Sequence, residues 1–138
     1  MEKVFLDTSF LFAFYNADDE DHIKAIDIAN ELSDRNTIFV ISDYIIDELL
    51  TLLLSRVGKL KTIKLCNDLV DDIREGLLTI IYVNYEVFAG ALKIFINFED
   101  KEWSFTDCTS FVLIKKEKIN KAISFDEHFS QFGIEILP

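Results

Sequence analysis

Proline and glycine are scarce in this chain, with one Pro and four Gly among 138 residues. Half of the residues are hydrophobic, which excludes collagen-like repeats, low-complexity linkers and general disorder. A chain of this length should bury about two-thirds of the surface that its unfolded form exposes. We therefore expect a single domain over residues 1–138, without an internal boundary or repeat.

Cysteine and long apolar runs are also in short supply. Cys66 and Cys108 stand far apart, which fits neither a disulfide framework nor a zinc-ligand spacing, so we interpret both as small core residues. No apolar run reaches the roughly 18 residues that cross a bilayer, and the first residues, MEKVFLDTSF, do not resemble a signal peptide. We expect a cytoplasmic protein without a membrane segment.

Positive charge is scarce, because 25 acidic residues outnumber 14 basic ones and leave a net charge of −11. This balance argues against sequence-independent wrapping of nucleic acid, which needs a broad basic surface. Local contacts to a phosphate backbone remain open at two basic stretches, although solvated helix ends are the simpler interpretation. The first stretch holds Arg56, Lys59, Lys61 and Lys64, and the second holds Lys115, Lys116, Lys118 and Lys121.

Strand-like runs alternate with helical patterns along the chain. Strands are predicted over residues 4–6, 37–41, 78–83 and 122–125, with a short fifth strand over 134–137. Helices are predicted over residues 19–33, from a cap at Ser42 to about residue 57, and over 60–74, 86–98 and 105–118. The alternation predicts the α/β class, with a mostly parallel sheet covered by helices on both faces.

Two acidic residues follow predicted strands directly, since Asp7 ends the run VFL and Asp126 ends AISF. In open parallel sheets, ligands bind beyond the carboxyl ends of the strands. The simpler alternative is that each Asp caps the helix after it.

Two further acids have unusual neighbours. Glu48 lies in YIIDELLTLLL, on a mostly apolar helix face, and therefore needs either a place at the rim of the core or a compensating cation. Asp107 lies near the start of a helix among several hydroxyl residues, where an acid is also favoured by the helix dipole alone.

Four carboxylates about 5 Å apart would repel by about 3 kcal/mol for each close pair at an effective dielectric constant of about 20. Either the four acids do not cluster, or some are protonated, or a divalent cation holds them together. All-oxygen ligands favour Mg²⁺ or Mn²⁺ over zinc.

The segments VFLDTSFL, ISDYIIDELLTLL, SFTDCTSFVLIKK and AISFDEHF resemble, in order, the four acidic motifs of the PIN domain family. The resemblance implies an α/β/α sandwich and an Mg²⁺- or Mn²⁺-dependent ribonuclease. Its catalytic and metal-binding acids would be Asp7, Glu48, Asp107 and Asp126, with Thr8, Ser9 and Thr106 as supporting hydroxyl residues. Small VapC-like members of the family are toxins that cut RNA, commonly form homodimers and are held inactive by a cognate antitoxin, which we expect to cover the acidic cleft.

The expected chemistry is hydrolysis of an RNA phosphodiester bond, with Asp7 as a metal ligand that Thr8 or Ser9 orients. The first basic stretch, Arg56, Lys59, Lys61 and Lys64, and the second would contact the RNA backbone beside this cleft.

Other interpretations stay open at this point. A PIN-like RNA-binding or assembly module without turnover, an RNA-processing nuclease without a toxin role, and a receiver-like domain that accepts phosphate on an aspartate all place acids at strand ends. We interpret His22 and His128 as surface or capping residues and the Phe-rich segments SFLFAFY and VFAGALKIFINF as core or dimer surface.

Overall fold

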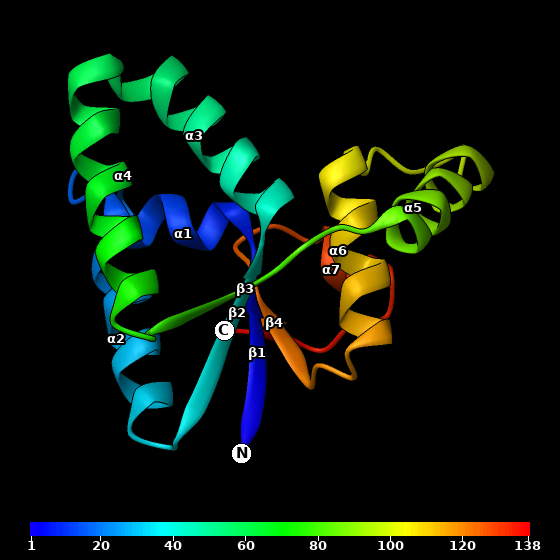
Figure 1. Ribbon diagram of the computed structural model, residues 1–138, viewed down its shortest axis with the longest axis horizontal. Helices are drawn as coiled ribbons and strands as arrows, with labels where there is room; N and C mark the ends of the chain where they lie inside the picture. The colour runs from blue at the N-terminus through cyan, green and yellow to red at the C-terminus, as the bar shows by residue number, and fades with distance from the viewer.

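The computed structural model describes residues 1–138 and contains one parallel sheet with helices on both faces (Figure 1). The strands, in the order in which the chain forms them, are β1 (Glu2–Leu6), β2 (Thr37–Ser42), β3 (Leu78–Ile81), β4 (Lys121–Ile123) and β5 (Ile136–Leu137). Their order in the sheet is β3-β2-β1-β4-β5, and every pairing is parallel. The predicted α/β class is confirmed.

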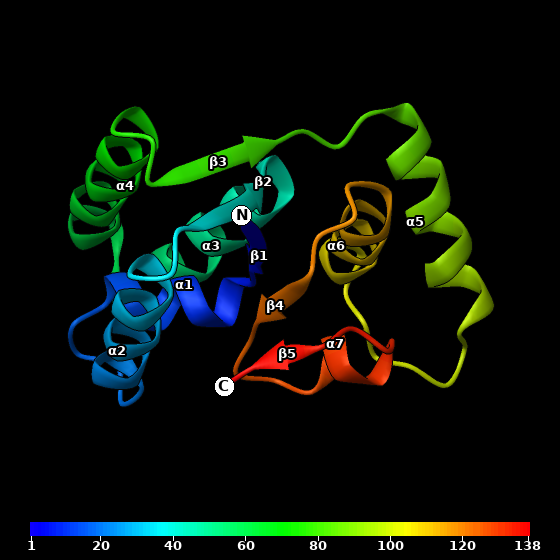
Figure 2. The same cartoon turned by 90° about the horizontal axis from the view of Figure 1, so that it is seen from below.

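Seven helices connect and cover these strands (Figure 2). They are α1 (Thr8–Tyr15), α2 (His22–Ser33), α3 (Asp43–Val57), α4 (Lys59–Arg74), α5 (Tyr85–Asn97), α6 (Phe105–Lys116) and α7 (His128–Gln131). Helices α1, α2 and α4 lie on one side of the sheet, and α5, α6 and α7 lie on the other, which gives the expected α/β/α sandwich. No helix is both long and apolar enough to cross a membrane.

The core forms where the apolar runs predict it. Val4, Phe5 and Leu6 of the central strand β1 are all buried, because helices cover both faces of the sheet there. This burial places the end of β1 in the middle of the molecule. The backbone N–H of Asp7 continues the ladder by donating to the carbonyl oxygen of Ile123 at 3.1 Å, so the ends of β1 and β4 lie side by side.

Helices α3 and α4, both predicted, form an antiparallel hairpin. Ser42 caps α3 by accepting a hydrogen bond from the backbone N–H of Ile45 at 3.1 Å. Gly58 alone separates the two helices, and its φ of +83° is a left-handed value that other residues rarely adopt. The hairpin extends beyond the sheet on the side where the strands end (Figure 1).

The structure differs from the prediction at two helices and at several strand ends, since β1 begins at Glu2 and β5 begins at Ile136. Helices α1 and α7 were not predicted, because TSFLFAFY has no polar face that would show a helical period and α7 is only 4 residues long. The predicted strands 78–83 and 122–125 are too long. Side chains replace the sheet ladder there, since Asp43 accepts from the N–H of Val83 and Ser9 accepts from the N–H of Phe125, both at 3.0 Å.

Candidate metal-binding site

Three carboxylates from three different elements converge beyond the carboxyl ends of the strands. Asp7 follows β1, Glu48 lies on α3 and Asp107 lies on α6, and each offers one oxygen within 4.8 Å of the other two. They line a hollow of about 380 Å³. Its other lining residues are Thr8, Ser9, Leu52, Glu102, Ser104, Asp126 and His128. The structure therefore places all four predicted acids around one hollow. Three of them bring carboxylate oxygens close enough together to share one cation.

Asp7 occupies the position before α1, yet its side chain does not cap that helix. Its Oδ2 instead accepts hydrogen bonds from the hydroxyls of Ser9 at 2.9 Å and Ser124 at 2.8 Å. Its Oδ1 accepts none, although the residue is only 2% exposed. The capping alternative is wrong for Asp7, and two hydroxyls fix the carboxylate so that one oxygen is free.

Asp107 both caps its helix and faces the hollow. Its Oδ2 accepts from the backbone N–H of Ser104 at 3.1 Å, within a capping box, and from Nδ1 of His128 at 2.8 Å. The Oδ1 atom accepts no hydrogen bond. The capping alternative and the site role are therefore compatible here, because they use different oxygens of one carboxylate.

Glu48 and Thr8 both line the hollow. Glu48 is partly buried and forms no ion pair, and its one hydrogen bond is a long contact of 3.4 Å from the Ser104 hydroxyl to Oε2. Thr8 is 5% exposed, and its Oγ1 atom is buried without a hydrogen-bond partner. An unpaired hydroxyl beside three free carboxylate oxygens is a combination that a bound cation with its hydration shell would satisfy.

Asp126 lies in the loop after β4 and is partly exposed. Because β4 ends at Ile123, Asp126 does not end the strand as predicted, and its Oδ1 accepts from the backbone N–H of His128 at 3.0 Å. The third predicted supporting residue, Thr106, does not line the hollow. Its carbonyl oxygen instead accepts hydrogen bonds from the hydroxyls of Thr109 and Ser110 inside α6.

Burial and mutual repulsion work against negative charge in this hollow. Burial, followed by repulsion from Asp126 and Asp107, raises the pKa of Asp7 from 3.8 to about 7, although two serine hydroxyls oppose the change. Burial also raises the pKa of both Glu48 and Asp107. No Lys or Arg lines the hollow. A divalent cation would therefore replace the missing positive charge.

The donor atoms fit a hard divalent cation. The free donors are carboxylate and hydroxyl oxygens, which suit Mg²⁺ or Mn²⁺. The one histidine of the lining, His128, uses its Nδ1 to contact Asp107. The receiver-like alternative, by contrast, needs a lysine beside the aspartates, and the lining contains none.

The sequence did not predict four polar residues that line the hollow or support its acids: Glu102, Ser104, Ser124 and His128. The interpretation of His128 as a surface or capping residue is wrong, since its imidazole contacts Asp107. Its place two residues after Asp126, within the same motif, is the signal that pointed to it. His22 has a structural contact, between Nδ1 and the carbonyl oxygen of Ala13 at 2.8 Å.

The two basic stretches have different surroundings. In the first, Arg56, Lys59 and Lys64 are exposed around the α3–α4 turn, whereas Lys61 pairs with Asp18 at 2.6 Å. The second begins at the carboxyl end of α6, about 12 Å along the helix from Asp107. There Lys116 pairs with Glu86 and Lys121 pairs with Glu2. Neither stretch lines the hollow, so contact of either one with RNA beside the cleft stays a prediction.

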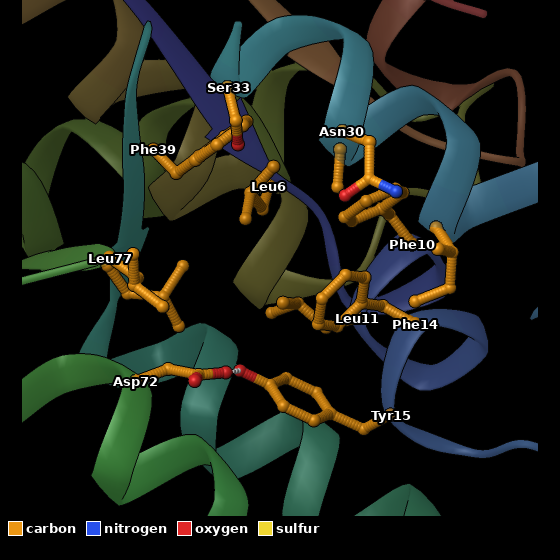
Figure 3. A pocket seen from close by; sticks show the side chains of 13 residues that line it. Leu6, Phe10, Leu11, Phe14, Tyr15, Asn30, Ser33, Phe39, Asp72 and Leu77 are labelled. Atoms are coloured by element: carbon orange, nitrogen blue, oxygen red, sulfur yellow. Dashed lines mark hydrogen bonds between the residues drawn. The ribbon is translucent and has the colours of Figure 1, made fainter. Parts of the chain in front are cut away.

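A second hollow, of about 220 Å³, lies among α1, α2, α4 and the adjoining strand ends (Figure 3). Ten of its 13 lining residues are hydrophobic. Its one carboxylate, Asp72, accepts a hydrogen bond from the Tyr15 hydroxyl at 2.5 Å. With a single acid, this hollow does not offer the ligands for a divalent cation.

Comparisons with known proteins agree with the fold. A family model described as PIN domain matches residues 4–135. A VapC ribonuclease from Archaeoglobus fulgidus is 33% identical over 127 residues, which cover 91% of this chain and 78% of the relative. The 23S rRNA-specific endonuclease VapC20 from Mycobacterium tuberculosis is 27% identical over 136 residues, which cover 98% of each chain.

Solved structures give the same result. The crystal structure of M. tuberculosis VapC20, described as a sarcin-ricin loop cleaving toxin, superposes with a TM-score of 0.81 at 27% identity and covers 95% of both chains. The structure of VapBC2 from Rickettsia felis, bound to a DNA fragment from their promoter, has a TM-score of 0.69 at 14% identity and covers 98% of this chain and 97% of that one. Because the identity to VapBC2 is only 14%, this similarity shows the fold alone.

Proposed function

The chain belongs to the PIN domain family, and from this membership we propose that it is a metal-dependent endoribonuclease, the toxin of a toxin–antitoxin pair. The observation that carries the proposal is the meeting of Asp7, Glu48 and Asp107, with one oxygen each within 4.8 Å, in a hollow without basic side chains. The VapC relatives support the toxin role.

Asp7, Glu48 and Asp107 would hold Mg²⁺ or Mn²⁺, directly or through water, and Asp126 would complete the site from the β4–α7 loop. When bound, the ion lowers the pKa of a water molecule and stabilises negative charge on the attacked phosphate. The protein contributes orientation. Ser9 and Ser124 fix Asp7, and the Ser104 backbone fixes Asp107, so that each carboxylate presents one oxygen without reorganising.

RNA is the proposed substrate, and the exposed Arg56, Lys59 and Lys64 are its proposed backbone contacts. Lys61 is less available, because Asp18 and Asn16 already hold its ammonium group. The VapC20 relative acts on 23S rRNA, which makes ribosomal RNA the first substrate to test. An enzyme with such a substrate would work in the cytoplasm.

An antitoxin protein is the proposed partner of this site. The hollow contains five acids and no Lys or Arg, so a partner that inserts a basic side chain would neutralise the charge that otherwise binds the cation. The antitoxin and Mn²⁺ should therefore compete for the site.

A homodimer is proposed through the outer face of α5. Val87 and Ala91 pack this helix into the molecule, while Tyr85, Phe95 and Ile96 are 83%, 52% and 66% exposed. An exposed apolar face of this kind marks an interaction surface. Helix α5 lies at the outer edge of the molecule, beyond α6 (Figure 2), so two copies could associate there in spite of the net charge of −11.

Cleavage of ribosomal RNA in the presence of Mn²⁺ tests the proposal. Glu48→Gln should abolish cleavage, because it removes a ligand charge, while Asp47→Asn on the neighbouring exposed position should cleave like the wild type. Loss of activity in Asp7→Asn and Asp107→Asn should accompany loss of Mn²⁺ binding in calorimetry. Full activity of Glu48→Gln, or equal loss in Asp47→Asn, would contradict the assignment.

A further inference from the structure

His128 contacts two of the acids at once. Its Nδ1 lies 2.8 Å from Oδ2 of Asp107 on α6, and its backbone N–H donates to Oδ1 of Asp126 at 3.0 Å. Asp107 and Asp126 belong to different elements, and His128 is the residue through which the β4–α7 loop is attached to α6 at the site. The four proposed metal-binding acids do not by themselves explain why His128 contacts two of them.

The contact with Asp107 decides which of its oxygens is free. Oδ2 receives two donors, the Ser104 backbone N–H and the His128 imidazole, and Oδ1 receives none. Asp7 is arranged in the same way by two serine hydroxyls. Carboxylates that bind metals are commonly held by such outer hydrogen bonds, and losing one typically costs about 10- to 100-fold in metal affinity or activity.

The imidazole of His128 is not part of the hydrophobic core. Helix α7 is anchored by the next residue, Phe129, which is fully buried and packs against Phe5 and Phe111 with ring centroids 6.3 Å and 5.1 Å apart. The His128 side chain is 33% exposed. Its position is therefore better explained by the site than by the core.

We propose that His128 is a positioning residue, whose Nδ1–H holds the Asp107 carboxylate so that Oδ1 faces the cation together with Asp7 and Glu48. The inference rests on the proposed metal-dependent function and assigns a role that the four acidic motifs do not include. This role uses Nδ1, which already contacts the carboxylate, and does not require the ring to bind the cation.

Two isosteres separate the nitrogens of the ring. The amide nitrogen of Asn stands as many bonds from the backbone as Nδ1, and that of Gln as many as Nε2. In calorimetric titration with Mn²⁺, His128→Ala and His128→Gln should bind about 10- to 100-fold more weakly than the wild type. His128→Asn should stay within about threefold. In cleavage assays, kcat should fall in the first two variants while KM for RNA is unchanged.

The outcomes distinguish the two proposals. If the wild type itself binds no Mn²⁺, the proposed function fails. If the wild type binds and all three variants bind equally well, only the role of His128 fails. Rescue by Gln instead of Asn, or nitrogen hyperfine coupling in the Mn²⁺ electron paramagnetic resonance spectrum, would assign a direct contact through the ring and overturn the positioning role. The melting temperature of each metal-free variant shows whether it is folded.

Discussion

Asp7 is held in surroundings that oppose its charge, and this has a consequence for folding. Its pKa is raised from 3.8 to about 7 in the folded protein, by burial first and then by Asp126 and Asp107. A raised pKa in the folded state means that the folded protein binds the proton more tightly than the unfolded chain. Stability from this group is therefore fully present below about pH 4 and is lost as the pH rises through about 7.

We expect the metal-free protein to melt at a higher temperature at pH 5 than at pH 8, by roughly 5 °C, which corresponds to about 1–2 kcal/mol. Asp7→Asn should lose most of this pH dependence and should be more stable than the wild type at pH 8 without metal. Thermal melts in chelator at both pH values test this. An unchanged pH dependence in Asp7→Asn would show that the carboxylate is not the group responsible.

Metal binding should offset the loss of folding stability that the charged carboxylates cause. Mn²⁺ at 100 times its dissociation constant should raise the free energy of unfolding by about 2.7 kcal/mol, because only the folded chain brings the three oxygens together. The effect should be large at pH 8 and smaller at pH 5, where protons compete for Asp7. Calorimetric melts with and without Mn²⁺ measure it, and Asp107→Asn should show little or no shift.

At the scale of single residues, the sequence identifies the acids better than the residues that hydrogen-bond to them. Asp7 and Glu48 are conspicuous because an acid at the end of an apolar run, or on an apolar helix face, needs an explanation. Ser124 and His128 are not conspicuous, since a serine or histidine after a strand has many ordinary uses. Their roles depend on distances between residues that are 117 and 21 positions apart, which only the fold supplies.

Among the helices, the α3–α4 hairpin carries the proposed RNA contacts. Replacing Arg56, Lys59 and Lys64 by Gln should weaken RNA binding and reduce the slope of log affinity against log salt by about 2 to 3, because three phosphate contacts are removed. Binding at several salt concentrations measures this. The matched control replaces Lys115, Lys116 and Lys118, on and after the distal end of α6. Equal losses in both triple variants would indicate a general charge effect instead of a defined contact.

Helix α1 is tied to α4 by a polar contact inside an apolar hollow (Figure 3). The Tyr15 hydroxyl donates to Asp72 at 2.5 Å, and burial first, then this carboxylate, raises the pKa of Tyr15, so the hydroxyl stays protonated. Tyr15→Phe should cost about 1–2 kcal/mol, since a partly buried carboxylate loses its donor. Chemical denaturation measures the loss, and Tyr85→Phe, at an 83% exposed tyrosine, should have almost no effect. Equal stability of both variants would show that the contact between Tyr15 and Asp72 does not stabilise the fold.

Helix α1 also shows where pattern reasoning fails at this scale. Helices α2 to α6 have polar faces or clear caps, and the sequence predicts them to within a few residues. TSFLFAFY is apolar on nearly all sides because α1 packs between other elements, with Phe10, Leu11 and Ala13 buried. A segment without a polar face carries no period, so its conformation is decided by its neighbours.

For the whole molecule, the alternation of strands and helices was sufficient to predict the sheet and its layers, because parallel strands require crossover helices. The strand order and the surface that remains exposed were not predictable from it. The exposed face of α5 is an example, since VFAGALKIFINF is equally compatible with core and with dimer surface. The structure distinguishes core from surface in this segment, because one face of α5 packs on α6 and the other stays exposed.

The proposed dimer gives a prediction at this scale. Ile96→Asp should convert a dimer to a monomer, because it places a charge in the centre of an apolar interface. Light scattering after size exclusion measures the mass. Ile23→Asp, at a residue that is 75% exposed on α2, is the matched control and should leave the mass unchanged. A monomeric wild type, or a dimeric Ile96→Asp, would contradict the interface.

The four acids that the sequence motifs predict divide evenly along the chain, and this has a practical use. Asp7 and Glu48 precede the exposed turn at Gly76, whereas Asp107 and Asp126 follow it. A single cut at that turn would leave two halves that each carry half of the ligands, so neither half would be toxic alone. Fusing the halves to two interacting proteins would then turn RNA cleavage into a complementation signal.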